Sequence, residues 1–218
     1  MSISTMIIGE SGTGKTTSLR NLNPAQVLLI QAVRKPLPFR SNDWKPCTKA
    51  DPQGSVIVTD VAHLILAAME RTSRPVIVID DFQYILSNAF MRRSSETGFQ
   101  KFTEIAKDAW DILMKASNLP PEKRVYILAH SQTDDAGKVK CKTIGKLLDE
   151  KITVEGLLTI VLRTAVINDQ FVFATQNNGS DTTKSPIGMF AETHIPNDLA
   201  AVDAAICDYY QLTATTTA

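Results

Sequence analysis

The sequence carries no net charge and no long hydrophobic run, and each absence excludes a class of protein. Lysine plus arginine and aspartate plus glutamate both number 23 among the 218 residues, so the formal net charge is zero. A uniformly basic surface for nucleic acid is therefore excluded, and any contact with DNA or RNA must come from a local patch. Neither a basic-then-apolar leader nor a membrane-length apolar run is present, so we expect a cytoplasmic protein without a membrane segment.

Cysteine is also scarce, which excludes a disulfide-rich or zinc-stabilised scaffold. The three cysteines, Cys47, Cys141 and Cys207, are odd in number, widely separated and without zinc-ligand spacing, so we expect reduced thiols. Hydrophobic residues make up 44% of the chain, enough to bury one sizeable core. We therefore expect a single domain over residues 1–212, followed by a short frayed tail of small polar residues at 213–218.

The most informative motif lies near the amino terminus. Residues 9–16 read Gly-Glu-Ser-Gly-Thr-Gly-Lys-Thr and fit the pattern G-x-x-x-x-G-K-[ST] at every position, between an apolar strand and a predicted helix. Such a glycine-rich loop turns backbone N–H groups toward anionic oxygens, and its glycines permit the backbone angles required. A flexible turn that happens to match is the alternative. The motif predicts a site for ATP at Gly9, Glu10, Ser11, Gly12, Thr13, Gly14, Lys15, Thr16 and Thr17.

Two of these residues have specific expected roles. We expect Lys15 to place a mobile positive charge on the β- and γ-phosphates, and the Thr16 hydroxyl to bind Mg²⁺. A second signal comes from residues 76–79, four consecutive β-branched apolar residues that end in Asp80 and Asp81. An acidic residue at the carboxyl end of a buried strand is suited to orient the magnesium shell, which we expect of Asp80. Asp81 either polarises the attacking water or caps a turn or helix.

A third signal is a buried strand at residues 125–129 that ends in His130. In an α/β sheet the carboxyl ends of strands face the ligand crevice, so His130 or Gln132 is placed to contact the γ-phosphate. A purely structural histidine is the alternative, and the sequence leaves the two readings open.

Apolar, β-branched runs alternate with helical segments along the chain, which predicts an α/β fold. Asn168-Asp169 between two apolar runs predicts a hairpin turn. We expect a three-layer P-loop domain with a mainly parallel sheet, one late antiparallel hairpin, and the strand at 125–129 inserted between the glycine-loop strand and the Asp80 strand. Expected strands are residues 4–8, 27–30, 55–58, 76–79, 125–129, 158–167 and 171–175, and expected helices are 15–22, 61–71, 100–116 and 198–210.

Caps and loops complete this prediction. Asp60 and Asn197 are expected to cap the helices at 61–71 and 198–210, and the latter helix is expected to present Leu199, Val202, Ile206 and Tyr209 to the sheet. Residues 31–54, 88–98 and 131–145 are expected to be irregular, and long loops in a compact domain are usually functional or disordered.

Taken together, these features resemble the RecA-like ATPases. The closest resemblance is to short phage-encoded proteins described as nucleotide-binding or single-strand annealing recombination ATPases. The resemblance covers nearly the whole chain and is carried by the glycine-rich loop and Asp80, by Ala-His-Ser at 129–131 and Leu-Arg-Thr at 162–164, and by the stretches 183–190 and 195–199. It implies a RecA-like core, ATP hydrolysis with Mg²⁺, and recombination activity through annealing or exchange of single-stranded DNA. For a phage protein, the compartment is the bacterial host cytoplasm.

The resemblance also implies how the subunits and DNA are engaged. ATP would lie between subunits of a filament or ring, with Lys184 reaching the neighbour's γ-phosphate, although an ordinary loop lysine is the alternative. A phage or host single-strand binding protein is a further implied partner. Two loops would contact single-stranded DNA, although ordinary exposed charges are the alternative, and the residues implied are Phe90, Arg92, Arg93, Lys138, Lys140 and Lys142.

One departure from the family concerns catalysis. RecA-like proteins carry a water-activating glutamate just after the second strand, where this chain has Gln31. Glutamine can orient a water molecule but cannot accept its proton, so hydrolysis is expected to be slow unless Asp81 substitutes. Two other functions therefore stay open. One is a motor or partition-type ATPase acting on a protein partner, and the other is an ATP-dependent binding switch with negligible turnover.

Overall fold

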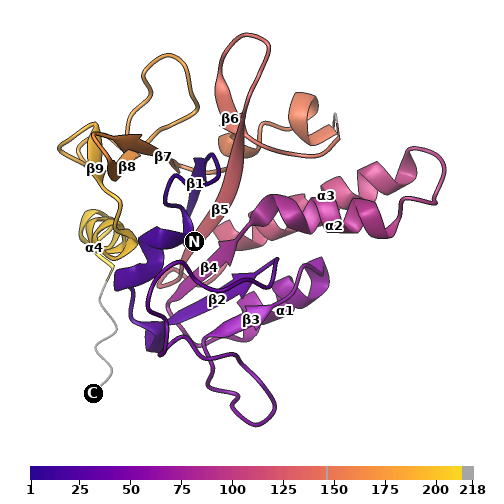
Figure 1. Cartoon of the computed structure of the whole chain (residues 1–218), viewed down its shortest axis with the longest axis horizontal. Coiled ribbons are helices and arrows are strands. Elements are labelled where there is room, and N and C mark those ends of the chain that lie inside the picture. The colour runs from indigo at the N-terminus through magenta and orange to yellow at the C-terminus, as the bar shows by residue number, and fades with distance from the viewer. Residues whose placement is uncertain (146, 213–218) are drawn as a thin grey trace.

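The computed structural model describes residues 1–145 and 147–212, with only the backbone at positions 149 and 150. The tail expected to fray, residues 213–218, lies outside the described residues. Within them the strands form one nine-stranded sheet in the order β3-β2-β4-β5-β1-β7-β8-β9, and β6 pairs with β5 off this path (Figure 1). The strands are β1 Ile3–Gly9, β2 Val27–Gln31, β3 Val56–Val58, β4 Val76–Asp80, β5 Arg124–Thr133, β6 Val139–Cys141, β7 Ile160–Ile167, β8 Gln170–Ala174 and β9 His194–Pro196.

The central part of the sheet is parallel. β3, β2, β4, β5, β1 and β7 pair in parallel in this order. β2 and β4 are buried along their whole length, which explains why their sequences are continuous apolar runs rather than alternating ones. β5 lies between β1 and β4, which confirms the predicted insertion of segment 125–129 between these two strands.

The carboxyl-terminal part of the sheet is an antiparallel meander of β7, β8 and β9. Asn168 and Asp169 have φ angles of 50° and 60° in the turn between β7 and β8. Positive φ at both central residues is what a two-residue hairpin turn needs to match the twist of its strands, and Asn and Asp tolerate it better than most residues. The predicted hairpin is therefore confirmed, and β9 extends it to three strands.

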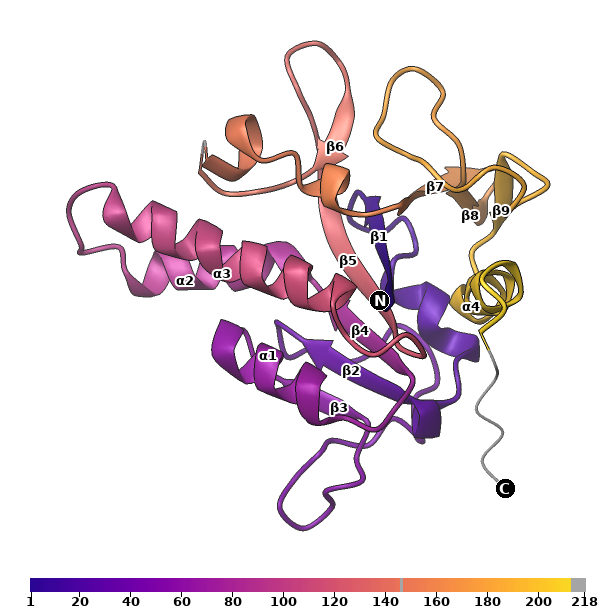
Figure 2. The ribbon, with the colours of Figure 1, turned by 180° about the vertical axis from the view of Figure 1, so that it is seen from behind.

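Helices cover both faces of the sheet (Figure 1, Figure 2). Ile7 and Ile8 point to opposite faces, because side chains alternate along a strand. Ile8 packs in the cluster with α1, α2 and α3, whereas Ile7 packs with η1 and α4. No helix among the described residues is long and apolar enough to cross a bilayer. The helices are α1 Ala62–Arg71, α2 Phe82–Arg92, α3 Gln100–Ser117 and α4 Leu199–Tyr209, with short helical turns η1 Thr16–Asn21, η2 Pro24–Gln26, η3 Leu147–Lys151 and η4 Val154–Leu157.

Helix α4 is tied to the sheet by a polar cluster as well as by its apolar face. The Asp203 carboxylate accepts two hydrogen bonds of 2.9 Å from the Arg124 guanidinium and one of 2.5 Å from the Tyr126 hydroxyl. Leu199, Val202 and Ile206 are buried as predicted, but Tyr209 is 42% exposed, so the expected apolar face is one residue shorter. The polar cluster and the apolar face together hold α4 against the sheet.

The prediction for residues 88–98 is wrong in part, because α2 continues through Arg92. Phe90 is consequently helical, and its ring packs against Phe102 of α3 at 5.6 Å between centroids. Helical spacing of Phe82, Ile85 and Leu86 puts these side chains into the core, and the contact with α3 extends the helix beyond its strongly apolar first turns.

Three further local predictions are corrected. The helix expected at 15–22 is the shorter 3₁₀ turn η1. Asp60 does not cap α1, because its carboxylate accepts hydrogen bonds of 2.7 Å from both Asn88 and Arg92 of α2. Asp198 rather than Asn197 caps α4, because the backbone N–H groups of its first turn lie within reach of the Asp198 carboxylate.

Candidate functional site

The glycine-rich loop (residues 9–16) connects the end of β1 to η1 at the carboxyl edge of the parallel strands. Gly12 and Gly14 have φ angles of 78° and 96°, values that strain a residue with a Cβ atom. Their positions in the sequence motif therefore match the backbone geometry that a phosphate-binding loop needs. Strands of the meander pack against the loop, so its conformation is fixed by tertiary contacts rather than being that of a flexible turn.

Two of the glycines are also required by this packing. A Cβ atom on Gly9 would lie 1.9 Å from Thr164 Oγ1, and one on Gly14 would lie 3.0 Å from the Phe171 ring. Thr164 is a buried residue of β7, and its hydroxyl lies 2.6 Å from that of Thr13 in the loop. Strands β7 and β8 thus support the loop by direct packing. The sequence did not indicate this role of Thr164.

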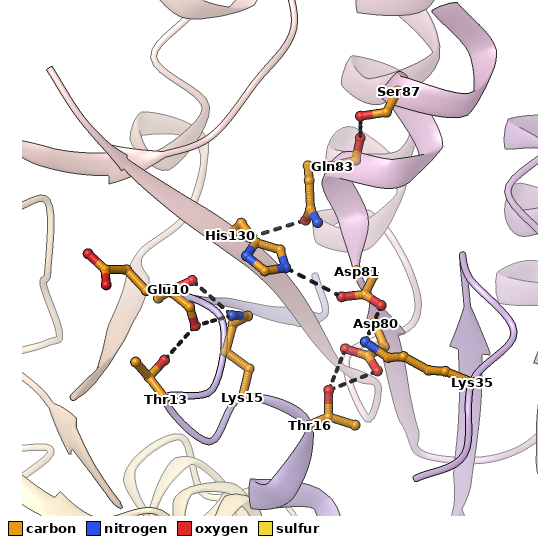
Figure 3. Close-up of polar contacts among 11 residues, drawn as sticks. Glu10, Thr13, Lys15, Thr16, Lys35, Asp80, Asp81, Gln83, Ser87 and His130 are labelled. Atoms are coloured by element: carbon orange, nitrogen blue, oxygen red, sulfur yellow. Dashed lines mark hydrogen bonds and ion pairs between the residues drawn. The ribbon is translucent and has the colours of Figure 1, made fainter. Parts of the chain in front are cut away.

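Lys15 is buried and curls back over the loop. Its Nζ donates hydrogen bonds of 2.8 Å to the Gly9 carbonyl and 2.7 Å to the Glu10 carbonyl (Figure 3). Burial lowers the pKa of Lys15 to about 8, although Asp81 and Asp80 oppose this change. A buried ammonium group with a lowered pKa gains stability from an added anion, so the loop fits a phosphate group on an observation independent of the motif.

Thr16 and Asp80 meet at the end of β4. The Thr16 hydroxyl lies 3.1 Å from Asp80 Oδ1 and 3.0 Å from Oδ2, and Asp80 is fully buried. Burial, together with the neighbouring charge of Asp81, raises the pKa of Asp80 to about 6. A divalent cation would stabilise this carboxylate in its ionised form. The predicted pair of magnesium ligands is therefore side by side.

The donor set fits Mg²⁺ better than a metal held by protein ligands alone. In the part of the chain that the structure describes, no group of three or more His, Cys, Asp and Glu side chains could hold an ion. Mg²⁺ prefers oxygen ligands, keeps several waters and takes other ligands from phosphates. Thr16 and Asp80 match that pattern.

Asp81 sits in a strained backbone conformation at the start of α2. Its φ and ψ are 63° and 43°, in the left-handed region, which costs on the order of 1–3 kcal/mol for a residue other than glycine. Asp81 is the N-cap residue of α2, as the capping alternative has it, but its side chain makes no capping hydrogen bond to the helix. The buried carboxylate instead pairs with Lys35 and lies 3.8 Å from His130 Nε2. Its role in activating water stays a prediction.

His130 lies on β5 with its imidazole turned toward the Asp81 carboxylate (Figure 3). Its backbone N–H donates a 3.1 Å hydrogen bond to the Gln83 side chain, which fixes β5 against α2. Burial and the positive charge of Lys15 lower the pKa of His130, so the neutral imidazole dominates at pH 7. Gln132 lies two residues farther along, opposite Lys140 in the pairing of β5 with β6.

The loop, Asp81 and His130 surround one pocket of about 180 Å³, which Lys35 and Pro38 also line. A larger hollow of about 490 Å³ between β3 and α1 has a mostly apolar lining that includes Leu28, Ile57 and Leu64. We assign the functional site to the smaller pocket, because it gathers two lysines and an aspartate beside the glycine-rich loop. Lys35 and Gln83 are site residues that the sequence did not indicate, since neither belongs to a recognisable motif.

Lys184 lies apart from this pocket. Its backbone N–H and carbonyl pair with Val161 of β7 at 2.9 Å and 2.8 Å, and the side chain is half-buried. Lys184 is not one of the described residues that line the pocket. Contact with a phosphate in another subunit is therefore the only form of the prediction that stays open.

The first implied DNA-binding segment has its charges matched inside the protein. Arg92 pairs with Asp60 at 2.7 Å, and Arg93 pairs with Glu96 and Glu104 at 2.7 Å each. Both arginines are thus paired with carboxylates, and the ammonium group nearest the Phe90 ring is that of Lys101, 5.3 Å from the ring centroid. The implied contact of these three residues with DNA stays a prediction.

The second implied segment corrects the expectation that residues 131–145 are irregular, because the end of β5 and β6 form an extended hairpin there. β6 pairs antiparallel with β5, and Lys138 and Lys142 at its two ends are exposed whereas Lys140 is half-buried. The Asp134 carboxylate accepts hydrogen bonds from two backbone N–H groups of the turn, so it shapes the hairpin. The hairpin stands out from the sheet in both views (Figure 1, Figure 2).

Comparison with known proteins adds no family to these observations: neither a scan against protein-family models nor a search of curated proteins gives a match. The candidate site therefore rests on the geometry of this chain alone.

Proposed function

We propose that the chain is a RecA-like P-loop ATPase that binds ATP with Mg²⁺. The observation that carries the proposal is the meeting of three features at one pocket edge. These are a loop with glycines at positive φ, the buried ammonium group of Lys15, and the Thr16–Asp80 pair. The placement of β5 between β1 and β4 supports the RecA-like assignment, as this strand order separates the additional-strand ATPases from simple kinases.

Each residue has a role in this proposal. The amides of the glycine-rich loop and Lys15 bind the phosphates, and Thr16 and Asp80 hold the metal. Bound Mg²⁺ supplies neutralisation of phosphate charge. Asp81 is buried beside His130, and it orients the attacking water or accepts its proton. His130 is part of β5, so a change in the pocket that moves His130 also moves this strand. The reaction class is hydrolysis of the terminal phosphoanhydride.

We further propose single-stranded DNA as the partner whose binding ATP controls, with annealing or strand exchange in recombination as the outcome. β5 supports this coupling, because one continuous strand runs from the buried core past His130 into the hairpin that carries Lys138 and Lys142. A shift of His130 is thereby transmitted to two exposed cations. Phosphate contacts of this kind bind without regard to base sequence.

In the assembled form, ATP lies between adjacent subunits of a filament or ring, and Lys184 acts on the neighbour's phosphate. A phage or host single-strand binding protein fits the same pathway as a DNA-loading partner.

Substitution of Lys15 tests the ATPase proposal. Lys15→Ala is expected to weaken ATP binding or reduce turnover by at least about a hundredfold, because it removes the buried charge-assisted contacts to phosphate. Lys107→Ala, which alters an exposed lysine of α3, is the matched control and should behave as the wild type. Unchanged ATP affinity and hydrolysis rate in Lys15→Ala would refute the site.

The same assays separate the two alternative functions. A protein partner is favoured if single-stranded DNA does not change the rate of ATP hydrolysis, and if the protein does not bind DNA at low salt in the presence of a non-hydrolysable ATP analogue. ATP-dependent DNA binding with negligible hydrolysis favours a binding switch. Buried Asp81 in the pocket supports turnover over the second alternative.

A further inference from the structure

Lys35 is a second lysine in the candidate pocket, and none of the motifs accounts for it. It lies in the irregular segment after β2 and lines the same pocket as Lys15, Thr16 and His130. Its Nζ forms an ion pair with the Asp81 carboxylate (Figure 3). The pocket therefore holds a lysine and an aspartate that neutralise each other, in addition to the residues assigned to phosphate and metal.

The backbone of Lys35 is fixed by β2. Gln31, the last residue of β2, is buried and stands opposite Asp80 in the parallel pairing of β2 with β4. Its side-chain amide donates a 3.3 Å hydrogen bond to the Lys35 carbonyl. The residue at the position of the family's catalytic glutamate thus contacts the backbone of Lys35 through an N–H donor, which a glutamate carboxylate lacks.

The two partners of the ion pair differ in their freedom to move. The Lys35 side chain is 40% exposed, whereas the Asp81 side chain is 4% exposed and belongs to a strained residue between β4 and α2. Lysine carries its charge on a flexible four-carbon stem. Exchange of partners therefore requires only that the Lys35 Nζ rotate away while Asp81 stays in place.

The charges of the pocket favour such an exchange when a triphosphate is present. Lys15 and Lys35 line the pocket with two positive charges, Asp81 lines it with one negative charge, and Asp80 lies next to it against Thr16. Burial disfavours the charged form of Lys35, but the hydrogen bond and the charges of Asp81 and Asp80 outweigh it and raise the pKa of Lys35, so the group stays cationic. A terminal phosphate adds negative charge in the same space and competes with Asp81 for this ammonium group.

We propose that Lys35 is the residue that distinguishes ATP from ADP, binding the terminal phosphate in exchange for its ion pair with Asp81. The exchange releases the Asp81 carboxylate to act on water, so Asp81 becomes available only when a third phosphate is bound. The inference rests on the proposed nucleotide site and goes beyond it by assigning the group that reads the terminal phosphate.

Calorimetric titration of Lys35→Met with ATP and with ADP, each with Mg²⁺, tests the inference. Methionine keeps most of the stem and removes the charge. We expect ATP affinity to fall about tenfold or more, the size of one charge-assisted hydrogen bond, with ADP affinity unchanged within about twofold. Lys107→Met is the matched control, and the melting temperature of each variant verifies its folding.

Asp81→Asn supplies a second, opposite test. Loss of the competing carboxylate is expected to raise ATP affinity more than ADP affinity, and Lys35→Met in the same chain is expected to abolish the difference. Equal effects of Lys35→Met on ATP and ADP, or none on either, would overturn the assignment of Lys35 while leaving the nucleotide site intact. Failure of the wild type to bind either nucleotide would instead overturn the proposed function itself.

Discussion

At the scale of single residues, the glycine-rich loop depends on side chains from strands more than 150 positions away in the chain. Thr164 of β7 contacts Thr13 and leaves no room for a Cβ atom at Gly9. The invariance that the motif demands at this glycine therefore has a packing reason in addition to phosphate approach. The loop and the meander are packed directly against each other.

Substitution of Gly9 by alanine tests this dependence. The new methyl group would overlap the Thr164 hydroxyl, so Gly9→Ala is expected to lower the free energy of unfolding by about 1–3 kcal/mol, the usual cost of overpacking. Chemical denaturation measures the change. Gly156→Ala is the control, since its Cβ atom would meet ordinary contacts at 3.6 Å. A Gly9→Ala variant as stable as the wild type would show that the loop is not held against β7.

At the scale of elements, β5 connects the pocket to the basic hairpin. The strand is ten residues long, and its first six positions are buried, whereas its last four extend beyond the core. Its pairing with β6 places Lys138 and Lys142 at the two ends of the shorter strand. The hairpin is also attached to the segment after β8, because the Val139 N–H donates a 2.8 Å hydrogen bond to the Ser180 carbonyl.

Salt dependence of DNA binding tests the hairpin. Each phosphate contact with a single strand contributes a slope of about −0.7 in log affinity against log salt, so changing Lys138 and Lys142 together to glutamine is expected to reduce the slope by about 1.4. Fluorescence anisotropy with a single-stranded oligonucleotide and an ATP analogue measures it. Lys107→Gln should leave the slope unchanged. Unaltered binding by the hairpin variant would place the DNA contact elsewhere.

At the scale of the whole molecule, the parallel core was predictable, because continuous β-branched runs and a hairpin turn carry strong local signals. The strand order was predictable in one respect, the insertion of β5 between β1 and β4. Helix α2 beyond residue 88 was not, because Phe90 is held by its contact with Phe102 rather than by a pattern of its own. Asp60 was misassigned for a similar reason, since its partners Asn88 and Arg92 lie on another helix.

In the candidate site too, residues within sequence motifs were predictable, and residues placed by tertiary contacts were not. Lys15, Thr16 and Asp80 were predictable from motifs, and the structure brings them together. Lys35 could not be found, because it becomes part of the pocket only through the anchoring of an irregular segment by Gln31. Thr164 and Gln83 likewise act through neighbours distant in sequence, which no local pattern records.

Calorimetric titration of the wild-type protein with ATP, with Mg²⁺ and then with excess chelator, tests the central claim most directly. The pocket formed by Lys15, Thr16 and Asp80 predicts one binding site per chain, with affinity that falls when Mg²⁺ is removed because Thr16 and Asp80 then lose their shared ligand. Absence of binding heat at two temperatures, or an affinity independent of Mg²⁺, would contradict the account.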